Sequence, residues 1–231
     1  LNDKIFRYDV NGTLIKAIHI SAPLAFLALD DGEILVLSRL ADFSGSIFSI
    51  MNKDLEFETH SIELLDGGGY PVEARAMCFG RNDNEILVLD EYWGEVIRVD
   101  LSELRKAISR GDASFMGEFM LSIYDARNAD KGIYYVQDFN VKDIAFVRKT
   151  GQILISDAII TDTFVTSRIY SCSISSGSSS CQVWFREHSM ESFSFPFRIT
   201  VDEEKELVYV LFTMSSQVGV FTFDGGFPIA E

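Results

Sequence analysis

The side chains that could carry out hydrolysis are few and widely spaced. Nucleophilic catalysis needs a serine or cysteine beside a positioned base, and the only histidines are His19, His60 and His188. The chain contains neither a Gly-x-Ser-x-Gly motif nor a His-x-x-x-His pair. Gly67-Gly68-Gly69 is not followed by a helical pattern, so it predicts a turn rather than a phosphate-binding loop. The sequence therefore predicts no catalytic residue.

Two of the three cysteines are spaced as cross-strand neighbours in a hairpin. Cys172 and Cys181 bracket Ser-Ile-Ser-Ser-Gly-Ser-Ser-Ser, which is typical of a strand, a turn and a second strand. Opposite residues of antiparallel strands lie within disulfide distance, so a bridge is one expectation. A pair of free thiols on a serine-rich hairpin is the other. Cys78 lies in an apolar run and is expected to pack as a small buried side chain.

Two features favour a secreted, cell-surface or periplasmic protein. A disulfide between Cys172 and Cys181 would require an oxidising compartment. Asn11-Gly12-Thr13 matches the N-glycosylation pattern at Asn11, although Asn-Gly alone is also a favoured hairpin turn.

The acidic composition excludes some classes of partner. Lys and Arg number 20 against 35 Asp and Glu, which gives a net charge of −15. A field of this sign repels phosphate backbones and anionic lipid surfaces. No apolar run approaches the ~20 residues of a membrane-spanning helix. We therefore expect no nucleic-acid partner and no insertion into a membrane.

Internal repetition is the clearest indication of the fold. Glu33–Leu37 recurs letter for letter as Glu85–Leu89, and related runs occur at Gln152–Ser156 and Glu206–Val210. Short segments this rich in Ile, Val and Leu, bounded by polar residues, predict buried strands. Each follows another apolar run and a tight polar turn, and each precedes a third run and, in most units, a fourth. Four strands in roughly 40–50 residues are typical of a β-propeller blade.

The two ends of the chain carry incomplete units. Ile5–Tyr8 and Leu14–Ile18 predict a third and a fourth strand, while Val218–Asp224 and Phe227–Glu231 predict a third strand and the start of a fourth. We predict one all-β domain over residues 1–231, a β-propeller of four-stranded antiparallel blades, with four visible blades plus a partial one, five- or six-bladed in total. Either a shortened blade or strands outside this chain would close the ring, and unpaired sheet edges favour the second.

A long insertion between blades spans residues 100–140. Within it, Ser102–Arg110 predicts a short helix with a serine cap and Gly111 just past its end. A surface connection is one expectation for this insertion, and a functional segment is the other, because long connections in compact domains are often functional.

The repeat resembles the NHL-type β-propeller repeat. Asn84–Asp100, with its Ile-Leu-Val-Leu-Asp and Val-Ile-Arg-Val-Asp runs, is similar to one unit of that family. Phe195–Asp202 resembles the opening of the repeat, and Ile5–Leu14 resembles its closing hairpin. The resemblance implies an architecture and no particular activity, because a fold alone does not determine function.

The related gluconolactonase and senescence-marker propellers hold a divalent metal with a Glu, two Asn and an Asp. In this sequence only Asn140 stands where that family's Asn-Gly-Leu-Ala-Phe motif has a ligand, whereas Phe197 and Val72-Glu73 stand at two other ligand positions. A hard cation needs several oxygen ligands at once. The resemblance therefore implies Ca²⁺ at Asn140 only for an alternative function, a metal-dependent lactonase or hydrolase, and otherwise no cofactor is expected.

One face of a propeller carries both the loops that lead into first strands and the loops that join second to third strands. Tyr92-Trp93 is the strongest candidate contact there, because an aromatic pair in a polar loop is apolar area that favours a partner. Packing against a neighbouring blade is the alternative for these rings. We predict a non-enzymatic binding or scaffolding module that recognises a protein or a glycan. Polar residues expected on the same face are Asp90, Asn140, Asp157, Asp162 and His188.

Overall fold

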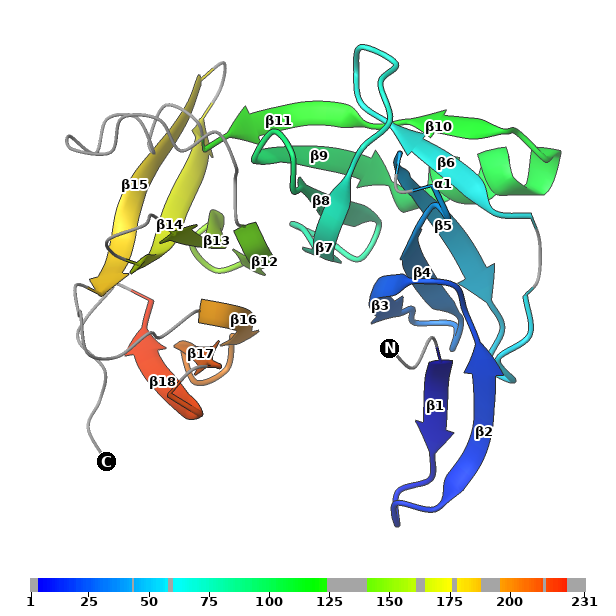
Figure 1. Ribbon diagram of the computed structural model, residues 1–231, viewed down its shortest axis with the longest axis horizontal. Coiled ribbons are helices and arrows are strands. Elements are labelled where there is room, and N and C mark those ends of the chain that lie inside the picture. The colour runs from blue at the N-terminus through cyan, green and yellow to red at the C-terminus, as the bar shows by residue number, and fades with distance from the viewer. Residues whose placement is uncertain are drawn as a thin grey trace.

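The computed structural model is almost wholly β-structure, and its sheets follow an arc (Figure 1). It describes residues 4–42, 44–57, 60–123, 141–160, 165–175, 178–187, 196–213 and 215–223. These residues contain five β-sheets and one helix, α1 (Leu101–Arg110). Within the described ranges, no helix combines the length and the hydropathy needed to span a bilayer.

Four of the sheets are propeller blades, numbered in chain order. Blade 1 contains β3 (Pro23–Ala28), β4 (Ile34–Arg39), β5 (Ser46–Met51) and β6 (Ile62–Leu65). Blade 2 contains β7 (Ala74–Phe79), β8 (Glu85–Asp90), β9 (Glu95–Asp100) and β11 (Glu118–Ser122). Blade 3 contains β12 (Val141–Val147), β13 (Gln152–Ile160), β14 (Val165–Ser175) and β15 (Ser178–Glu187). Blade 4 contains β16 (Pro196–Asp202), β17 (Leu207–Phe212) and β18 (Gln217–Thr222).

The predicted propeller, with four blades and a partial one, is confirmed. The partial blade is a hairpin of β1 (Lys4–Tyr8) and β2 (Leu14–His19) at one end of the arc, and blade 4 lies at the other end (Figure 1). Strands β3, β7, β12 and β16 lie on the inner side of the arc. The predicted strand within residues 227–231 lies outside the described residues.

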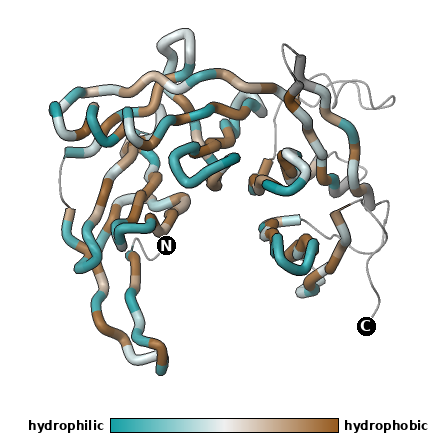
Figure 2. The backbone as a smooth tube through the Cα atoms, turned by 180° about the vertical axis from the view of Figure 1, so that it is seen from behind, coloured by the Kyte–Doolittle hydropathy of each residue, from teal (hydrophilic) through white to brown (hydrophobic). Residues whose placement is uncertain are grey.

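The hydrophobic core lies between neighbouring blades. Its central strands are fully buried because they consist of unbroken apolar runs, such as Leu35, Val36 and Leu37 in β4. Separate apolar clusters join blade 1 to blade 2, blade 2 to blade 3, and blade 3 to blade 4. Figure 2 shows this apolar colour along the strands and hydrophilic colour at many of the turns. Each blade is therefore stabilised mainly by the blades beside it.

Blades 1 and 2 are linked by a crossing of the chain. After α1, β10 (Ser114–Met116) returns to blade 1 and pairs parallel with β6, and β11 then pairs antiparallel with β9 of blade 2. The inserted segment therefore supplies the fifth strand of one sheet and the fourth strand of the next. Residues 124–140 of the predicted insertion lie outside the described residues.

The helix starts one residue earlier than the sequence predicts. Its N-cap is Asp100 and not Ser102, because the Asp100 carboxylate accepts a hydrogen bond of 3.0 Å from the Glu103 backbone N–H. The Ser102 hydroxyl donates to the same carboxylate at 2.6 Å. Gly111 ends the helix with φ of 75°, as predicted.

The fourth repeat is offset by one residue from its predicted alignment. Ser38, Asp90 and Asp157 each lie opposite the first residue of the inner strand in blades 1 to 3. In blade 4 that position belongs to Phe212, opposite Pro196, whereas the predicted start at Glu206 would place Leu211 there. Glu206 lies in the turn with φ of 56°, outside β17. The residue letters resemble a strand start, but the register is set by strand pairing.

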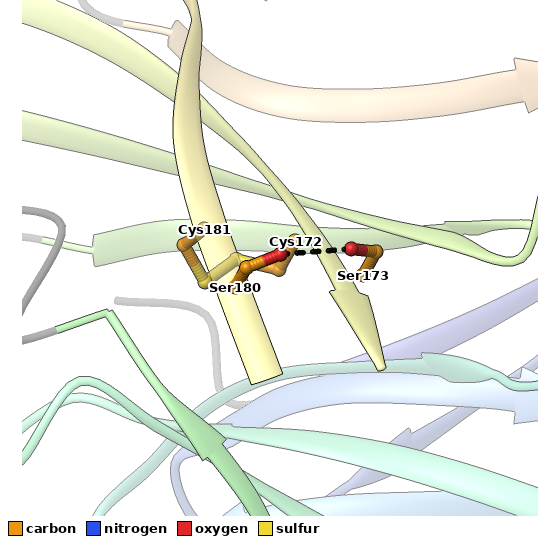
Figure 3. Close-up of a disulfide and its surroundings, with 4 residues drawn as sticks. All are labelled: Cys172, Ser173, Ser180 and Cys181. Carbon is orange, nitrogen blue, oxygen red and sulfur yellow. Dashed lines mark hydrogen bonds between the residues drawn. A yellow bond between two sulfur atoms is a disulfide. The ribbon is translucent and has the colours of Figure 1, made fainter. Parts of the chain in front are cut away.

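A disulfide crosses the outer hairpin of blade 3 (Figure 3). Cys172 on β14 and Cys181 on β15 are opposite each other, with their Cα atoms 4.0 Å apart. Beside them, the hydroxyls of Ser173 and Ser180 form a hydrogen bond of 3.0 Å. Cys78 is a free thiol on β7, and burial raises its pKa well above the usual range.

Candidate binding surface on blade 2

Asp90 fixes the loop that joins β8 to β9. Its Oδ1 atom accepts hydrogen bonds from the backbone N–H groups of Tyr92 and Trp93, each at 2.7 Å. Its Oδ2 atom accepts from the backbone N–H of Glu73 at 3.2 Å, and the Glu91 N–H donates to the Glu73 carbonyl at 2.7 Å. The loop entering β7 and the loop leaving β8 therefore lie side by side, as the repeat predicts.

The aromatic pair on this loop is open to solvent. Tyr92 is 58% exposed and Trp93 is 55% exposed. Their rings form an edge-to-face pair with centroids 4.7 Å apart. They pack on each other, and neither ring is buried in the core between blades. The pair presents rigid apolar area that is available for a partner.

The buried position of Asp90 corrects its predicted role. The residue is only 3% exposed, so its carboxylate does not face a ligand directly. Burial raises the pKa of Asp90 to about 6, although three backbone N–H donors favour the ionised form. Asp90 is a positioning residue for Tyr92 and Trp93.

Several carboxylates lie on or beside this loop. Glu95 follows the loop in sequence, and Asp66 lies in the loop between β6 and β7. Glu73 precedes β7 and contacts the loop through backbone hydrogen bonds. Partial burial raises the pKa of Glu95, and the negative charges of Asp90 and Asp66 raise it further. Glu91 differs from these acids, because it pairs with Arg39 at 2.8 Å. Asp66, Glu91 and Glu95 were not among the residues predicted for this surface, although the position of Glu91 and Glu95 beside Tyr92-Trp93 in sequence was an available signal.

The other predicted site residues do not join this surface. Asp157 occupies the position in blade 3 that Asp90 has in blade 2, and it is fully buried opposite Arg168. Its side chain is therefore enclosed in the blade and not presented on the surface, and its predicted role in binding stays a prediction. Asn11, the predicted glycosylation acceptor, lies in the exposed β1–β2 turn. Three predicted residues lie outside the described residues: Asn140, Asp162 and His188.

Two basic residues lie on inner strands near this surface. Arg75 on β7 and Lys142 on β12 occupy equivalent bulges in the register of neighbouring blades. Burial lowers the pKa of Lys142, and the Arg75 charge lowers it further, whereas Glu91 and Asp157 oppose the shift. Across the described ranges, no three His, Cys, Asp or Glu side chains are grouped so that they could hold a metal ion.

A cavity of about 270 Å³ lies at a different set of turns, between blades 1 and 2 and beside α1. Leu29, Phe79 and Leu101 supply its apolar lining. Its arginine is neutralised within the chain, because Arg105 pairs with Asp31 and Glu33 at 2.7 Å each. Arg105 therefore offers no free positive charge to a ligand in this cavity.

Comparisons with known proteins identify the fold alone. No protein-family model matches the chain. No curated protein matches it either. Among solved structures, a putative 6-phosphogluconolactonase from Bacteroides uniformis is 13% identical, with a TM-score of 0.56 over 95% of this chain and 60% of that one. A nidogen/laminin complex is 10% identical, with a TM-score of 0.61 over 96% of this chain and 71% of that one.

A third similar structure is a periplasmic gluconolactonase from Pseudomonas aeruginosa, with 10% identity and a TM-score of 0.53 over 96% of this chain and 60% of that one. The chain thus spans about 60% of the length of both lactonase-like structures. At these identities the likeness shows a β-propeller architecture, and activity has to be argued from the site.

Proposed function

We propose that this chain is a non-enzymatic binding module that recognises a protein or a glycan through the loops of blade 2. The observation that carries the proposal is the exposed ring pair of Tyr92 and Trp93, held by the buried Asp90. Aromatic residues presented on a rigid frame are typical anchors of interfaces, because they bury a large area at low cost in side-chain entropy. The NHL type of the repeat remains a prediction.

The proposal includes an extracellular or periplasmic location. The disulfide between Cys172 and Cys181 supports it, because such bonds persist in oxidising compartments. A similar structure described as a periplasmic gluconolactonase is in accord with that location.

The test compares two truncations of exposed aromatic residues on the same blade. The Tyr92→Ala/Trp93→Ala variant should lose at least about tenfold in affinity for partners captured by the wild-type protein from a protein and glycan array. Phe119→Ala is the matched control, because Phe119 is a 50% exposed aromatic on β11, outside the loop. The binding proposal fails if the double variant keeps full affinity, or if it unfolds while binding per folded molecule is unchanged.

Lactone hydrolysis is the second candidate function. It is favoured by one observation, that two of the similar structures are described as gluconolactonase-type proteins. The test is hydrolysis of glucono-lactone and 6-phosphoglucono-lactone by chelator-treated protein, with and without Ca²⁺, repeated with Asn140→Ala. Turnover that needs Ca²⁺ and is lost in the variant would favour the metal-dependent enzyme. Absence of turnover under both conditions would remove this function.

A further inference from the structure

The aromatic surface of blade 2 carries negative charge that the described residues do not neutralise. Elsewhere, surface acids such as Asp31, Asp83 and Glu118 pair with arginines. In the described part of the chain, Asp66, Glu73 and Glu95 form no ion pair with a basic residue. Near this surface the described basic residues on the inner strands are Arg75 and Lys142, and neither forms a salt bridge with these three acids. The three acids against these two bases leave a local excess of negative charge.

A second loop repeats the device that presents Tyr92 and Trp93. The Asp66 carboxylate accepts hydrogen bonds from the backbone N–H groups of Gly68 at 2.8 Å and Tyr70 at 2.9 Å. The Tyr70 ring is 70% exposed. Asp66 is near enough to Glu95 to affect its titration. Two neighbouring loops therefore each use an aspartate to hold an exposed aromatic residue beside acidic groups.

We propose that the occupant of this surface is a basic segment of a partner protein, with arginine or lysine side chains stacked on Trp93 and Tyr92 and paired with Glu95. This inference rests on the proposed binding function and narrows it. A cation over an aromatic face is attracted by the ring quadrupole, and the unpaired carboxylates add Coulomb attraction. The planar guanidinium of arginine satisfies both contacts at once. Neutral and acidic glycans carry no such cation, so charge complementarity favours a basic peptide.

The probe for the test is a fluorescein-labelled peptide of alternating Arg and Gly. The matched peptide contains citrulline in place of Arg, which keeps the shape and removes the charge. Binding is measured by anisotropy at about 150 mM salt, where screening suppresses long-range attraction. Trp184→Phe leaves Trp93 as the single tryptophan, so its fluorescence reports contact with the rings. We expect the Arg peptide, and not the citrulline peptide, to bind and to change Trp93 emission.

The variants separate a local site from general attraction to an acidic protein. Glu95→Gln should weaken binding of the Arg peptide about tenfold, equivalent to 1.4 kcal/mol. Glu204→Gln makes the same change in net charge in the exposed turn between β16 and β17, and should alter binding less than about twofold. Equal weakening by the two variants, or equal binding of the citrulline peptide, would overturn the inference.

The outcome is distinguishable from failure of the binding function itself. If Tyr92→Ala/Trp93→Ala abolishes capture of array partners while Glu95→Gln leaves that capture and Trp93 emission unchanged, the surface binds a partner that is not basic. The proposed function then stands and this inference fails. If the double variant has no effect in either assay, both are wrong.

Discussion

Asp90 connects the buried part of blade 2 with its exposed aromatic residues. Its carboxylate is enclosed, yet three backbone N–H groups point at it. The cost of burying a charge is therefore offset only in part by hydrogen bonds, and the raised pKa is the result. The same arrangement restricts the loop on which Tyr92 and Trp93 lie.

The titration of Asp90 predicts a pH dependence of stability. Its pKa is about 6 in the folded chain against 3.8 for the ordinary group, so the folded state binds more protons between these values. The contribution of Asp90 to the free energy of unfolding is thus largest below about pH 4 and falls as the pH rises through 6. The full difference is about 3 kcal/mol, of which about 2 kcal/mol falls between pH 4.5 and 7. Urea denaturation at pH 4.5 and 7 should show this fall in the free energy of unfolding of the wild type and a smaller fall in Asp90→Asn. An equal fall in the two proteins would contradict the prediction.

At the scale of elements, polar side chains join neighbouring blades in addition to the apolar contacts. Asp143 on β12 is 7% exposed, and its Oδ2 atom accepts from the Ile199 backbone N–H of β16 at 2.8 Å. Its Oδ1 atom pairs with Arg198 at 3.2 Å. Burial raises the pKa of Asp143. A single carboxylate thus joins blades 3 and 4.

Removing this link should destabilise the fold. Asp143→Ala leaves the buried Ile199 N–H without its acceptor, so we expect a loss of about 1–3 kcal/mol in urea denaturation. Asp143→Asn keeps an acceptor and should lose less. Asp112→Ala removes an exposed ion pair with Arg110 and should cost less than about 1 kcal/mol. Equal effects of Asp143→Ala and Asp112→Ala would show that the blade contact does not depend on this carboxylate.

The disulfide gives a second prediction at this scale. It closes a loop with a sequence separation of 9, and the entropy of so short a loop corresponds to about 2–3 kcal/mol. Thermal denaturation of the Cys172→Ser/Cys181→Ser variant should show this loss, and reduction of the wild type should reproduce it. Reductant should leave the variant unchanged. A large effect of reductant on the thermal denaturation of the variant would mean that the remaining thiol, Cys78, is responsible.

Elements were predictable where a local pattern determines them. The apolar runs of β4, β8 and β13 define strands because no other structure buries such runs so well. The return of β10 to blade 1 was not predictable, because a three-residue strand has no periodicity and its partner β6 is distant in sequence. The polar loop around Tyr92-Trp93 favoured two alternatives, an exposed contact and packing against a neighbouring blade, and the structure shows both rings more than half exposed. The burial of Asp90 was not predicted, because the residue type alone does not distinguish an aspartate that holds a loop from one that faces solvent.

For the whole molecule, net charge opposes compactness. An excess of 15 negative charges on 231 residues repels itself in the folded state more than in the expanded chain. Raising the salt concentration from about 20 to about 200 mM screens this repulsion. We expect a higher Tm at the higher concentration, measured with NaCl by differential scanning fluorimetry. A lower Tm would mean that the surface ion pairs, such as Arg148 with Asp83, contribute more than the repulsion.

The return of the chain from blade 2 to blade 1 has a consequence for how such a gene can be rearranged. A propeller whose blades are contiguous in sequence can gain or lose one repeat by duplication or deletion. Here, cutting between β6 and β7 would separate β6 from β10, and cutting after β9 would separate it from β11. Residues 23–122 are therefore the smallest segment that could be transplanted, duplicated or exchanged without leaving either blade short of a strand.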